Sequence, residues 1–338
     1  MRNLHVIASI VAVFSIAAIP MTAGNRYDIE VDGIYYILGG DTASVTYATS
    51  GSYNDYSGDV VIPNQIVKGS KTYRVAAIDD YAFHYCYDLN SITLGDSLTT
   101  ICMMGIYKCG IKEINIPDNV TSLLAYSLAE NDSLKTAKIG AGVTYLKPDL
   151  FYKCYALEEV TLGENVNHLG TYVFARCTSL KTVHWSGKED GINSYTFLGC
   201  TSLEEIELPE SITFVKKYAF SGCTALTKIY SYATTPPSIT EENAFDDDTY
   251  ENATLYVPTG CKETYAAATY WSRFINIEEM EDLDGVDEIC NESKTIVSER
   301  LYNLSGVETT EDSDGSKALY IVKRVYSDGT VSTAKEIR

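Results

Sequence analysis

Basic residues are few in this sequence. Its 338 residues include 26 Lys and Arg against 46 Asp and Glu, which gives a net charge of -20. A protein that binds nucleic acid needs a basic surface, because its cations must displace the counterions of the phosphates. The charge balance therefore argues against DNA and RNA as partners. We interpret the acidity as a source of solubility outside the cell.

Residues suited to catalysis or metal binding are also scarce. Of the four His residues, the three beyond residue 5 fall at unrelated positions: His84, His168 and His184. No HExxH or Cys-x-x-Cys completes a metal site, and neither GxSxG nor a phosphate-binding P-loop occurs. We expect His84 and His168 to be surface residues of loops. The acidic groups at 246–248 and 278–288 do not fit the EF-hand loop, so we expect them to be solvated. The sequence thus predicts no enzyme, no cofactor and no metal site.

The hydrophobic run from Val6 to Ile19 is too short to cross a bilayer, which takes about 20 residues. Arg2 precedes this run, and Met21-Thr22-Ala23 follows it. This arrangement is typical of a secretory signal peptide that is cut ahead of Gly24. We therefore predict that residues 1–23 are removed. The mature chain is then exported, extracellular or on the outer cell surface, and has no transmembrane helix.

A repeat of 23 residues occupies the middle of the chain. The same step separates its cysteines in two runs, Cys86 to Cys109 and then Cys154, Cys177, Cys200 and Cys223. One residue is missing after Cys109, so Asn131 occupies the cysteine slot of the next copy. A fixed period of this length is typical of solenoid proteins, in which each coil contacts only its neighbours.

Each repeat carries apolar residues at fixed positions. An apolar pair such as Val143 and Leu146 lies near its start, and a large residue such as Phe151 precedes the cysteine slot by three positions. The repeat ends in L-x-x-I-x-L, where alternate residues face opposite sides of a strand. The pattern predicts about seven coils over residues 75–230, with one short parallel strand in each 23-residue coil.

Two motifs connect these coils to known proteins. Leu157-x-x-Val160-x-Leu162-x-x-Asn165 matches the leucine-rich repeat pattern, and residues 219–223 give the signature A-F-x-x-C. With these motifs the coils resemble the BspA-like class of bacterial surface leucine-rich repeats. The resemblance implies a leucine-rich-repeat solenoid, α/β or mostly β, and adhesion to host or neighbouring-cell proteins. Trp185 and Glu189 depart from the pattern, so we expect an irregular coil between Trp185 and Tyr195.

The cysteines allow two interpretations. Exported proteins commonly form disulfides, and coils about 4.8 Å apart are within disulfide reach. Six of the nine cysteines share one repeat slot, however, so they would form a ladder with parallel Cβ vectors that Asn131 interrupts. We predict buried free thiols, which pack as small apolar groups.

The segments on either side of the repeats are predicted to cap the solenoid. Residues 24–74 contain short runs of alternating apolar and polar residues broken by Gly and Pro, which predicts a β-rich N-terminal cap. Residues 231–280 lack the period, which stops after Tyr230, ahead of Pro236-Pro237. They contain a strand at 254–257 and a short helix at 262–270, and we interpret them as a C-terminal cap.

The last segment, residues 281–338, begins with an acidic linker and is predicted to form a small β module. It has strand-like runs at 299–306 and 318–323 and a hairpin turn at 327–330. With its basic end, the module resembles the C-terminal sorting domains of the type IX secretion system. That resemblance implies passage across an outer membrane and attachment to the surface. A plain small β module is the alternative.

Outward side chains of the predicted strands form the candidate binding face, because such rows give solenoids their extended binding surface. The candidate binding residues are Lys138, Glu159, His184, Glu205, Glu207, Lys228 and Tyr230. The end of the row with His184, Glu205, Glu207 and Tyr230 is the first candidate. An ordinary solvated sheet face is the alternative.

These observations predict a monomeric, non-catalytic binding protein of the cell surface or the extracellular space. Its expected role is adhesion to host or neighbouring-cell proteins through the strand face. Glycan binding is one alternative, since exposed Tyr side chains suit both protein and sugar contacts. An enzyme with a site built across coils and a purely structural surface protein are the others.

Overall fold

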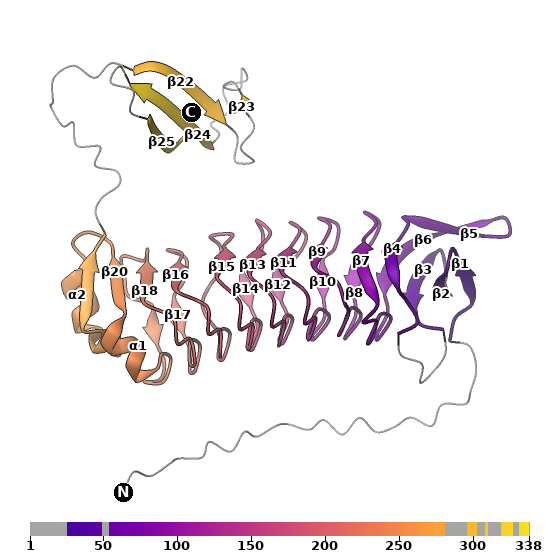
Figure 1. Cartoon of the computed structure of the whole chain (residues 1–338), viewed down its shortest axis with the longest axis horizontal. Helices are drawn as coiled ribbons and strands as arrows, with labels where there is room; N and C mark the ends of the chain where they lie inside the picture. The colour runs from indigo at the N-terminus through magenta and orange to yellow at the C-terminus, as the bar shows by residue number, and fades with distance from the viewer. Residues whose placement is uncertain are drawn as a thin grey trace, which may run out of the picture. The chain divides into compact units, whose positions relative to one another are not determined.

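The computed structural model describes residues 26–48, 54–280, 296–302, 308–309, 319–326 and 331–337. The predicted signal peptide, residues 1–23, and the linker from 281 to 295 lie outside the described residues. The chain divides into two compact units, Met1–Met280 and Glu281–Arg338. The first unit is a parallel β-solenoid of about nine turns with coils of about 23 residues, as the repeat predicts (Figure 1).

One row of parallel strands runs along the solenoid at the L-x-x-I-x-L positions. Thr136 pairs with Glu113 on one side and with Glu159 on the other, so neighbouring strands keep the step of 23 residues. The strands of this row are β4 (Gly58–Val61), β7 (Leu89–Thr93), β9 (Glu113–Asn115), β11 (Thr136–Lys138), β13 (Glu159–Thr161), β15 (Thr182–His184), β16 (Glu205–Leu208), β18 (Lys228–Ser231), β20 (Thr254–Val257) and β21 (Asn276–Glu279).

A second row lies at the apolar pairs, where the sequence pattern did not predict strands. Most of its strands are only two residues long, which is too short for an alternation to be recognised. They are β6 (Lys71–Ile78), β8 (Thr100–Ile101), β10 (Ser122–Leu123), β12 (Tyr145–Leu146), β14 (His168–Leu169), β17 (Phe214–Val215) and β19 (Ser238–Ile239). His168 therefore lies in a strand, and the prediction that it is a loop residue was wrong.

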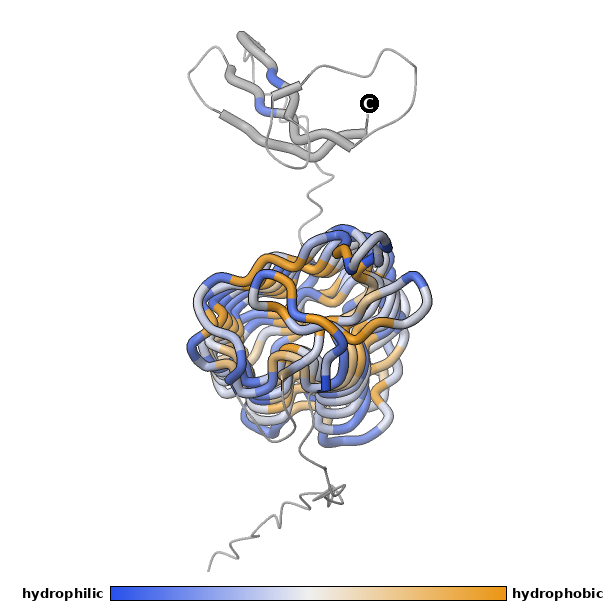
Figure 2. Tube along the Cα trace, turned by 90° about the vertical axis from the view of Figure 1, so that its right-hand side faces the viewer, coloured by the Kyte–Doolittle hydropathy of each residue, from blue (hydrophilic) through white to orange (hydrophobic). Residues whose placement is uncertain are grey.

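The large apolar residue of each coil stacks on that of the next. Ring centroids are 5.7 Å apart for Phe151 and Phe174, 5.4 Å for Phe174 and Phe197, and 5.1 Å for Phe197 and Phe220. All of these rings are fully buried. Seen end-on in Figure 2, hydrophobic residues lie along the walls of the coils and hydrophilic residues gather at the corners. An aromatic stack from Phe151 to Phe245 thus forms the centre of the core in the C-terminal half of the solenoid, whereas Ile106 and Leu128 fill the same slot in earlier coils.

The cysteine ladder consists of free, buried thiols, as predicted. Five of the thiols donate a hydrogen bond to a carbonyl oxygen of the preceding coil, 26 residues earlier. The pairs are Cys109 with Phe83 (2.9 Å), Cys154 with Leu128 (3.2 Å), Cys177 with Phe151 (3.1 Å), Cys200 with Phe174 (3.2 Å) and Cys223 with Phe197 (3.1 Å). Each slot therefore combines apolar packing with one link between coils.

Asn131 makes the corresponding links in the coil that is one residue short. Its Nδ2 donates to the carbonyl oxygens of Ile106 (2.9 Å) and Leu128 (2.8 Å). Its Oδ1 accepts the backbone N–H of Cys109 at 2.7 Å. In the other coils the N–H of the slot residue bonds three residues back, as from Cys154 to Phe151. The amide side chain thus satisfies backbone groups that the shortened coil would leave unpaired.

The irregular coil predicted between Trp185 and Tyr195 interrupts the first row. The hydrogen-bonded sheet of β9, β11, β13 and β15 ends there, and β16 begins a separate sheet. Glu189, which stands in an apolar slot, is fully buried. Its carboxylate accepts hydrogen bonds from the backbone N–H groups of Ser186 (2.9 Å) and Gly187 (3.0 Å). A tight turn with φ +78° at Gly187 replaces the regular strand exit at this point.

The flanking segments extend the rows as well as covering them. At the N-terminal end, β1 (Ile29–Val31), β2 (Ile34–Gly39) and β3 (Thr42–Thr46) form an antiparallel meander. β3 pairs in parallel with β6, which also pairs with β5 (Gln65–Lys68) in antiparallel fashion, and β4 pairs in parallel with β7. Segment 24–74 therefore contributes a strand to each row.

At the other end, the first row continues past Tyr230 through β20 and β21, although the period has stopped there. The helices α1 (Asp247–Asn252) and α2 (Lys262–Ala267) and the 3-10 turn η1 (Trp271–Arg273) lie between these last strands. Trp271 is fully buried, and its indole N–H donates to the carbonyl oxygen of Pro237 at 2.6 Å. Aromatic side chains thus close the core.

The second unit contains β22 (Ile296–Tyr302), β23 (Glu308–Thr309), β24 (Leu319–Tyr326) and β25 (Val331–Ile337). They form an antiparallel sheet in the order β23-β22-β24-β25. The antiparallel pairing of β24 with β25 agrees with the predicted hairpin, whose turn residues 327–330 lie outside the described residues.

Candidate functional site

The outward side chains of the first row, from β4 to β21, form a surface that we call the strand face. Its strands bury one residue and expose the next, as in the pattern exposed, buried, exposed of β9, β11 and β15. The outward residues stand in two parallel ladders, because the strands pair without a shift in register from β9 to β15. The irregular coil divides this face into two parts.

The first part carries three of the predicted site residues. Glu159 and His184 interact directly, since the His184 Nε2 lies 2.8 Å from the Glu159 Oε1. Both side chains are about half exposed, at 51% and 52%. Lys138 is exposed, and its side chain makes no hydrogen bond or ion pair with any residue that the structure describes. This part presents mixed charge to solvent.

The second part carries the other four predicted residues. Glu207 stands opposite Tyr230 in the register of β16 and β18, and Lys228 Nζ lies 3.7 Å from Glu205 Oε2. His184 lies on the neighbouring strand of the row, and within residues 54–280 β15 and β16 belong to different hydrogen-bonded sheets. The prediction that His184 forms one site with Glu205, Glu207 and Tyr230 stays a prediction.

Two tyrosines of this part were not predicted as site residues. Tyr256 follows Tyr230 in the ladder, and their rings stack with centroids 4.7 Å apart and planes inclined by 13°. Tyr232 is 42% exposed. Partial burial raises its pKa, and the nearby Glu207 and Tyr230 contribute further to the rise. We call Tyr230, Tyr232 and Tyr256, together with Glu205, Glu207 and Lys228, the tyrosine patch.

The sequence contained a signal for Tyr256. The strand at 254–257 was predicted, and Tyr256 occupies in it the position that Tyr230 occupies in its own strand. The two residues are 26 apart, however, because α1 lengthens the coil between them. A search at the period of 23 residues therefore does not align them.

The remaining histidines lie away from the strand face. His168 Nδ1 is 2.7 Å from Asp190 Oδ2, and its ring meets Tyr145 edge-on at 4.9 Å. His84 is half-buried and stacks on Tyr107 at 5.2 Å. Burial and then the positive charge of Lys108 lower the pKa of His84 to about 4.

The described residues contain no group of three or more His, Cys, Asp or Glu side chains placed to hold a metal ion. None of the helices in the described part of the chain has the length and apolar character needed to cross a membrane.

Solved structures of several bacterial leucine-rich repeat proteins are similar to this chain. A leucine rich cell surface protein from Faecalibacterium prausnitzii is 18% identical, with a TM-score of 0.33, over 79% of this chain and 97% of that one. A leucine-rich repeat protein from Eubacterium ventriosum is 27% identical, with a TM-score of 0.45, over 55% of this chain and 49% of that one. The leucine-rich repeat protein TpLRR from T. pallidum is 18% identical, with a TM-score of 0.43, over 72% and 96%.

A comparison with curated proteins found no match. The sequence profile of one protein family does match the chain. This family is described as BspA type leucine rich repeat region (6 copies), and its profile matches residues 66–181 and 172–294. The match covers more than half of the chain, and it includes the cysteine ladder and both rows of strands except β4. The chain therefore belongs to the BspA-type leucine-rich repeat family.

Proposed function

We propose that this protein is displayed at the cell surface and binds other proteins through its strand face, with the tyrosine patch at the centre of the contact. One observation carries the proposal: the stacked pair of Tyr230 and Tyr256 on an open parallel sheet. Tyrosine is enriched at protein interfaces, because its rigid ring supplies contact area at low cost in conformational entropy. The stacking holds both rings in place before a partner arrives.

The charges around the pair suggest what kind of protein binds. Glu207 stands next to Tyr230 in the ladder, and Glu278 stands next to Tyr256. Lys228 is the basic residue of the patch, and it is paired with Glu205. The excess of carboxylates favours a partner surface with lysine or arginine side chains, because complementary charge accelerates association and excludes acidic partners.

The orientation of the rings favours a protein ligand over a glycan. Sugars stack on the open face of an aromatic ring, whereas here the ring faces are turned toward each other along the ladder. The ring edges and hydroxyl groups are left for the ligand, which suits hydrogen bonds and edge contacts with a protein. Adhesion to host or neighbouring-cell proteins is the role that this arrangement supports.

A binding screen tests the proposal. The chain from residue 24 to 338 is applied to immobilised extracellular-matrix proteins and to a glycan array. A parallel sample carries Tyr230→Ser and Tyr256→Ser, and a matched control carries Glu113→Gln, which lies on the strand face outside the patch. We expect binding to a protein. The affinity should fall at least about tenfold in the double variant and stay unchanged in the control. Binding confined to glycans, or equal binding by the double variant, would contradict the proposal.

We also propose that the chain reaches the surface in two steps, by removal of residues 1–23 and by recognition of the C-terminal β module. The four antiparallel strands of the module and its resemblance to type IX sorting domains support this route. Deletion of residues 286–338 should abolish labelling of the protein on intact cells and leave its intracellular amount unchanged. Surface labelling that persists in the deletion variant would remove the sorting role.

A further inference from the structure

The first strand of the strand face, β4, has an unpaired edge. It pairs only with β7 among the described strands. The N–H groups of Gly58 and Ile62 donate to Asp88 and Thr93, both at 2.9 Å, on the side of β7. Because backbone groups alternate in direction along a strand, the N–H and C=O groups of Asp59 and Val61 point the other way. No described residue pairs with them.

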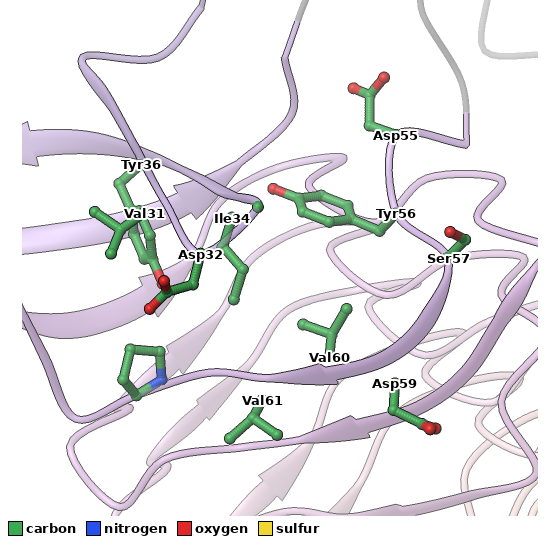
Figure 3. Close-up of a pocket in the computed structure, with 12 residues that line it drawn as sticks. Val31, Asp32, Ile34, Tyr36, Asp55, Tyr56, Ser57, Asp59, Val60 and Val61 are labelled. Atoms are coloured by element: carbon green, nitrogen blue, oxygen red, sulfur yellow. The ribbon is translucent and has the colours of Figure 1, made fainter.

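A pocket of about 600 Å³ lies along this edge, between β4 and the hairpin of β1 and β2 (Figure 3). Val31, Ile34, Val60 and Pro63 give it an apolar wall. Its acidic lining residues are Asp32, Asp55 and Asp59, and none of the described side chains that line it is basic. The pocket thus combines apolar surface with acidic side chains.

Two of the pocket's polar groups lack partners. Tyr36 is fully buried, and its hydroxyl makes no hydrogen bond with a described residue. The adjacent Tyr56 differs, since its hydroxyl donates to the carbonyl oxygen of Thr46 and accepts the backbone N–H of Tyr35. Asp32 is exposed and has no hydrogen-bond partner among the described residues. Figure 3 shows its carboxylate by the Tyr36 hydroxyl, and burial followed by the charge of Asp32 raises the pKa of Tyr36.

The other two carboxylates are partly engaged. Asp55 Oδ2 accepts the backbone N–H of Ala48 at 2.9 Å, and Asp59 Oδ1 accepts the Ser91 hydroxyl at 2.7 Å. These two bonds come from neutral donors and fix the carboxylates in place. A ligand for this pocket should therefore supply a positive charge, an apolar stem and hydrogen-bonding capacity for a phenol.

We propose that β4 binds an extended segment of a partner protein, which pairs with its open edge and places an arginine or lysine side chain in the pocket. The segment's backbone would hydrogen-bond to Asp59 and Val61, in the way that edge strands accept an added strand. Its aliphatic stem would pack on the apolar wall, and its cationic head would reach Asp32 and Tyr36. The added strand would extend the parallel row by one position beyond β4.

Val61 supports this assignment by its exposure. Its side chain is 63% exposed, although it belongs to a strand at the end of a sheet. Exposed, unprotected edges are hazardous for a soluble protein, and natural proteins usually protect them with Lys, Pro or a bulge. The β4–β7 pair has a register shift at Gly58 and Asp59, and Pro63 follows the strand, but β4 itself contains no Lys or Pro, and Val61 stays exposed. A binding function would explain why the edge is left open.

The proposal does not depend on the tyrosine patch, which lies at the other end of the same row.

A peptide-binding experiment tests the proposal. The probe is an octapeptide with blocked ends and a fluorescein label, which alternates valine and threonine and has one central arginine. We expect it to bind the chain from residue 24 to 338 in a fluorescence-anisotropy titration, more weakly at higher salt. Asp32→Asn should weaken binding about fivefold, as for a partly exposed ion pair. Tyr36→Phe should also weaken peptide binding, because this substitution removes the hydroxyl that the cationic head would reach and nothing else.

Backbone pairing is tested separately from charge. Methylation of alternate amides of the probe removes the N–H groups needed for pairing and leaves the protein unchanged, so it should abolish binding. Val61→Pro should do the same, because proline at an edge strand removes an N–H that does not bond to β7. Substitution of citrulline for the arginine should weaken binding as much as Asp32→Asn does.

Four results would overturn the proposal: no binding of the arginine peptide, equal binding of its methylated form, equal binding of its citrulline form, or loss of binding in the Tyr230→Ser, Tyr256→Ser variant. The last result would place the peptide on the tyrosine patch instead. Glu113→Gln again serves as the control on the strand face and should leave the affinity unchanged.

Discussion

The ring of Tyr230 stacks on the ring of Tyr256, with centroids 4.7 Å apart, although the coil between them contains a helix. The register of β18 and β20 brings the two residues together, because Tyr230 is paired directly with Tyr256. Each ring is therefore a neighbour that limits the movement of the other. The pair behaves as one surface, and its two members should not contribute independently to binding.

A double-mutant cycle on this pair should show strong coupling. Tyr230→Ala should release the Tyr256 ring, so the affinity for a protein partner should fall nearly as far in either single variant as in the double variant. Residues in direct contact commonly show coupling of about 0.5–3 kcal/mol. Isothermal titration of the four proteins measures it. Additive losses would show that the rings act separately.

Substitution of Phe197 by Ala should destabilise the solenoid at its centre. The ring is fully buried and stacks on Phe174 and Phe220, so its removal opens a cavity between three coils. Losses of about 3–5 kcal/mol are usual for such changes. Urea unfolding followed by circular dichroism measures the loss. Tyr155→Ala, at a side chain that is 40% exposed, is the control and should change the stability by less than about 0.5 kcal/mol.

Asn131→Ala should be more harmful than Cys177→Ala. The first change leaves the N–H of Cys109 and the carbonyl oxygens of Ile106 and Leu128 without their partner. Each unsatisfied buried group costs about 1–3 kcal/mol. The second change removes one thiol bond, to the carbonyl of Phe151. Thermal unfolding of the two variants compares them, and a smaller loss for Asn131→Ala would contradict the role given to the amide.

Asp149 should make the stability depend on pH. Burial raises its pKa from 3.8 to about 6, and a hydrogen bond from Tyr126 opposes the rise. The folded state therefore holds the proton more tightly than the unfolded state, so this group lowers the stability as the pH rises from about 4 to about 6. Asp149→Asn should raise the melting temperature at pH 8 and change it little at pH 3.5. Asn tolerates the φ of +59° found here. Equal effects at both pH values would rule out titration of Asp149 as the cause.

The thiols of the cysteine ladder should be protected in the native protein. They are buried, and burial raises the pKa of Cys177 and Cys200 well above the ordinary value, which suppresses the reactive thiolate. A thiol reagent should therefore modify Cys261 before any ladder residue, as peptide mapping can show. In denaturant without reductant, all nine cysteines should react. A lower number would indicate a disulfide.

The period of the sequence was sufficient to predict most of the solenoid. Cysteines at steps of 23 residues and the alternation around Ile206 gave the first row of strands, and Glu189 marked the irregular coil. The second row was missed, because a strand such as β14 has only two residues and makes no pattern. β4 was assigned to a cap, since pairing with β7 is a long-range contact without a local signal.

The candidate site was predicted less completely, for a related reason. Outward positions could be identified within single strands, so Glu205, Glu207 and Tyr230 were recognised. Which of them meet depends on where a sheet breaks and where a coil lengthens. The break after β15 places His184 in a different hydrogen-bonded sheet from this group, and the longer coil before β20 adds Tyr256. Neither event is visible from the composition of one repeat.

Asn131 has a consequence for how such arrays change during evolution. A coil that is one residue short disturbs the contacts with its neighbours, and the step of 23 residues resumes after it because each coil contacts only the next. The amide accepts the N–H of Cys109 and donates to Ile106, and so it bridges the shortened turn. Deletion and substitution are therefore a compensated pair. A gene duplication or recombination that separated the short coil from Asn131 would inherit a defect that neither parent shows.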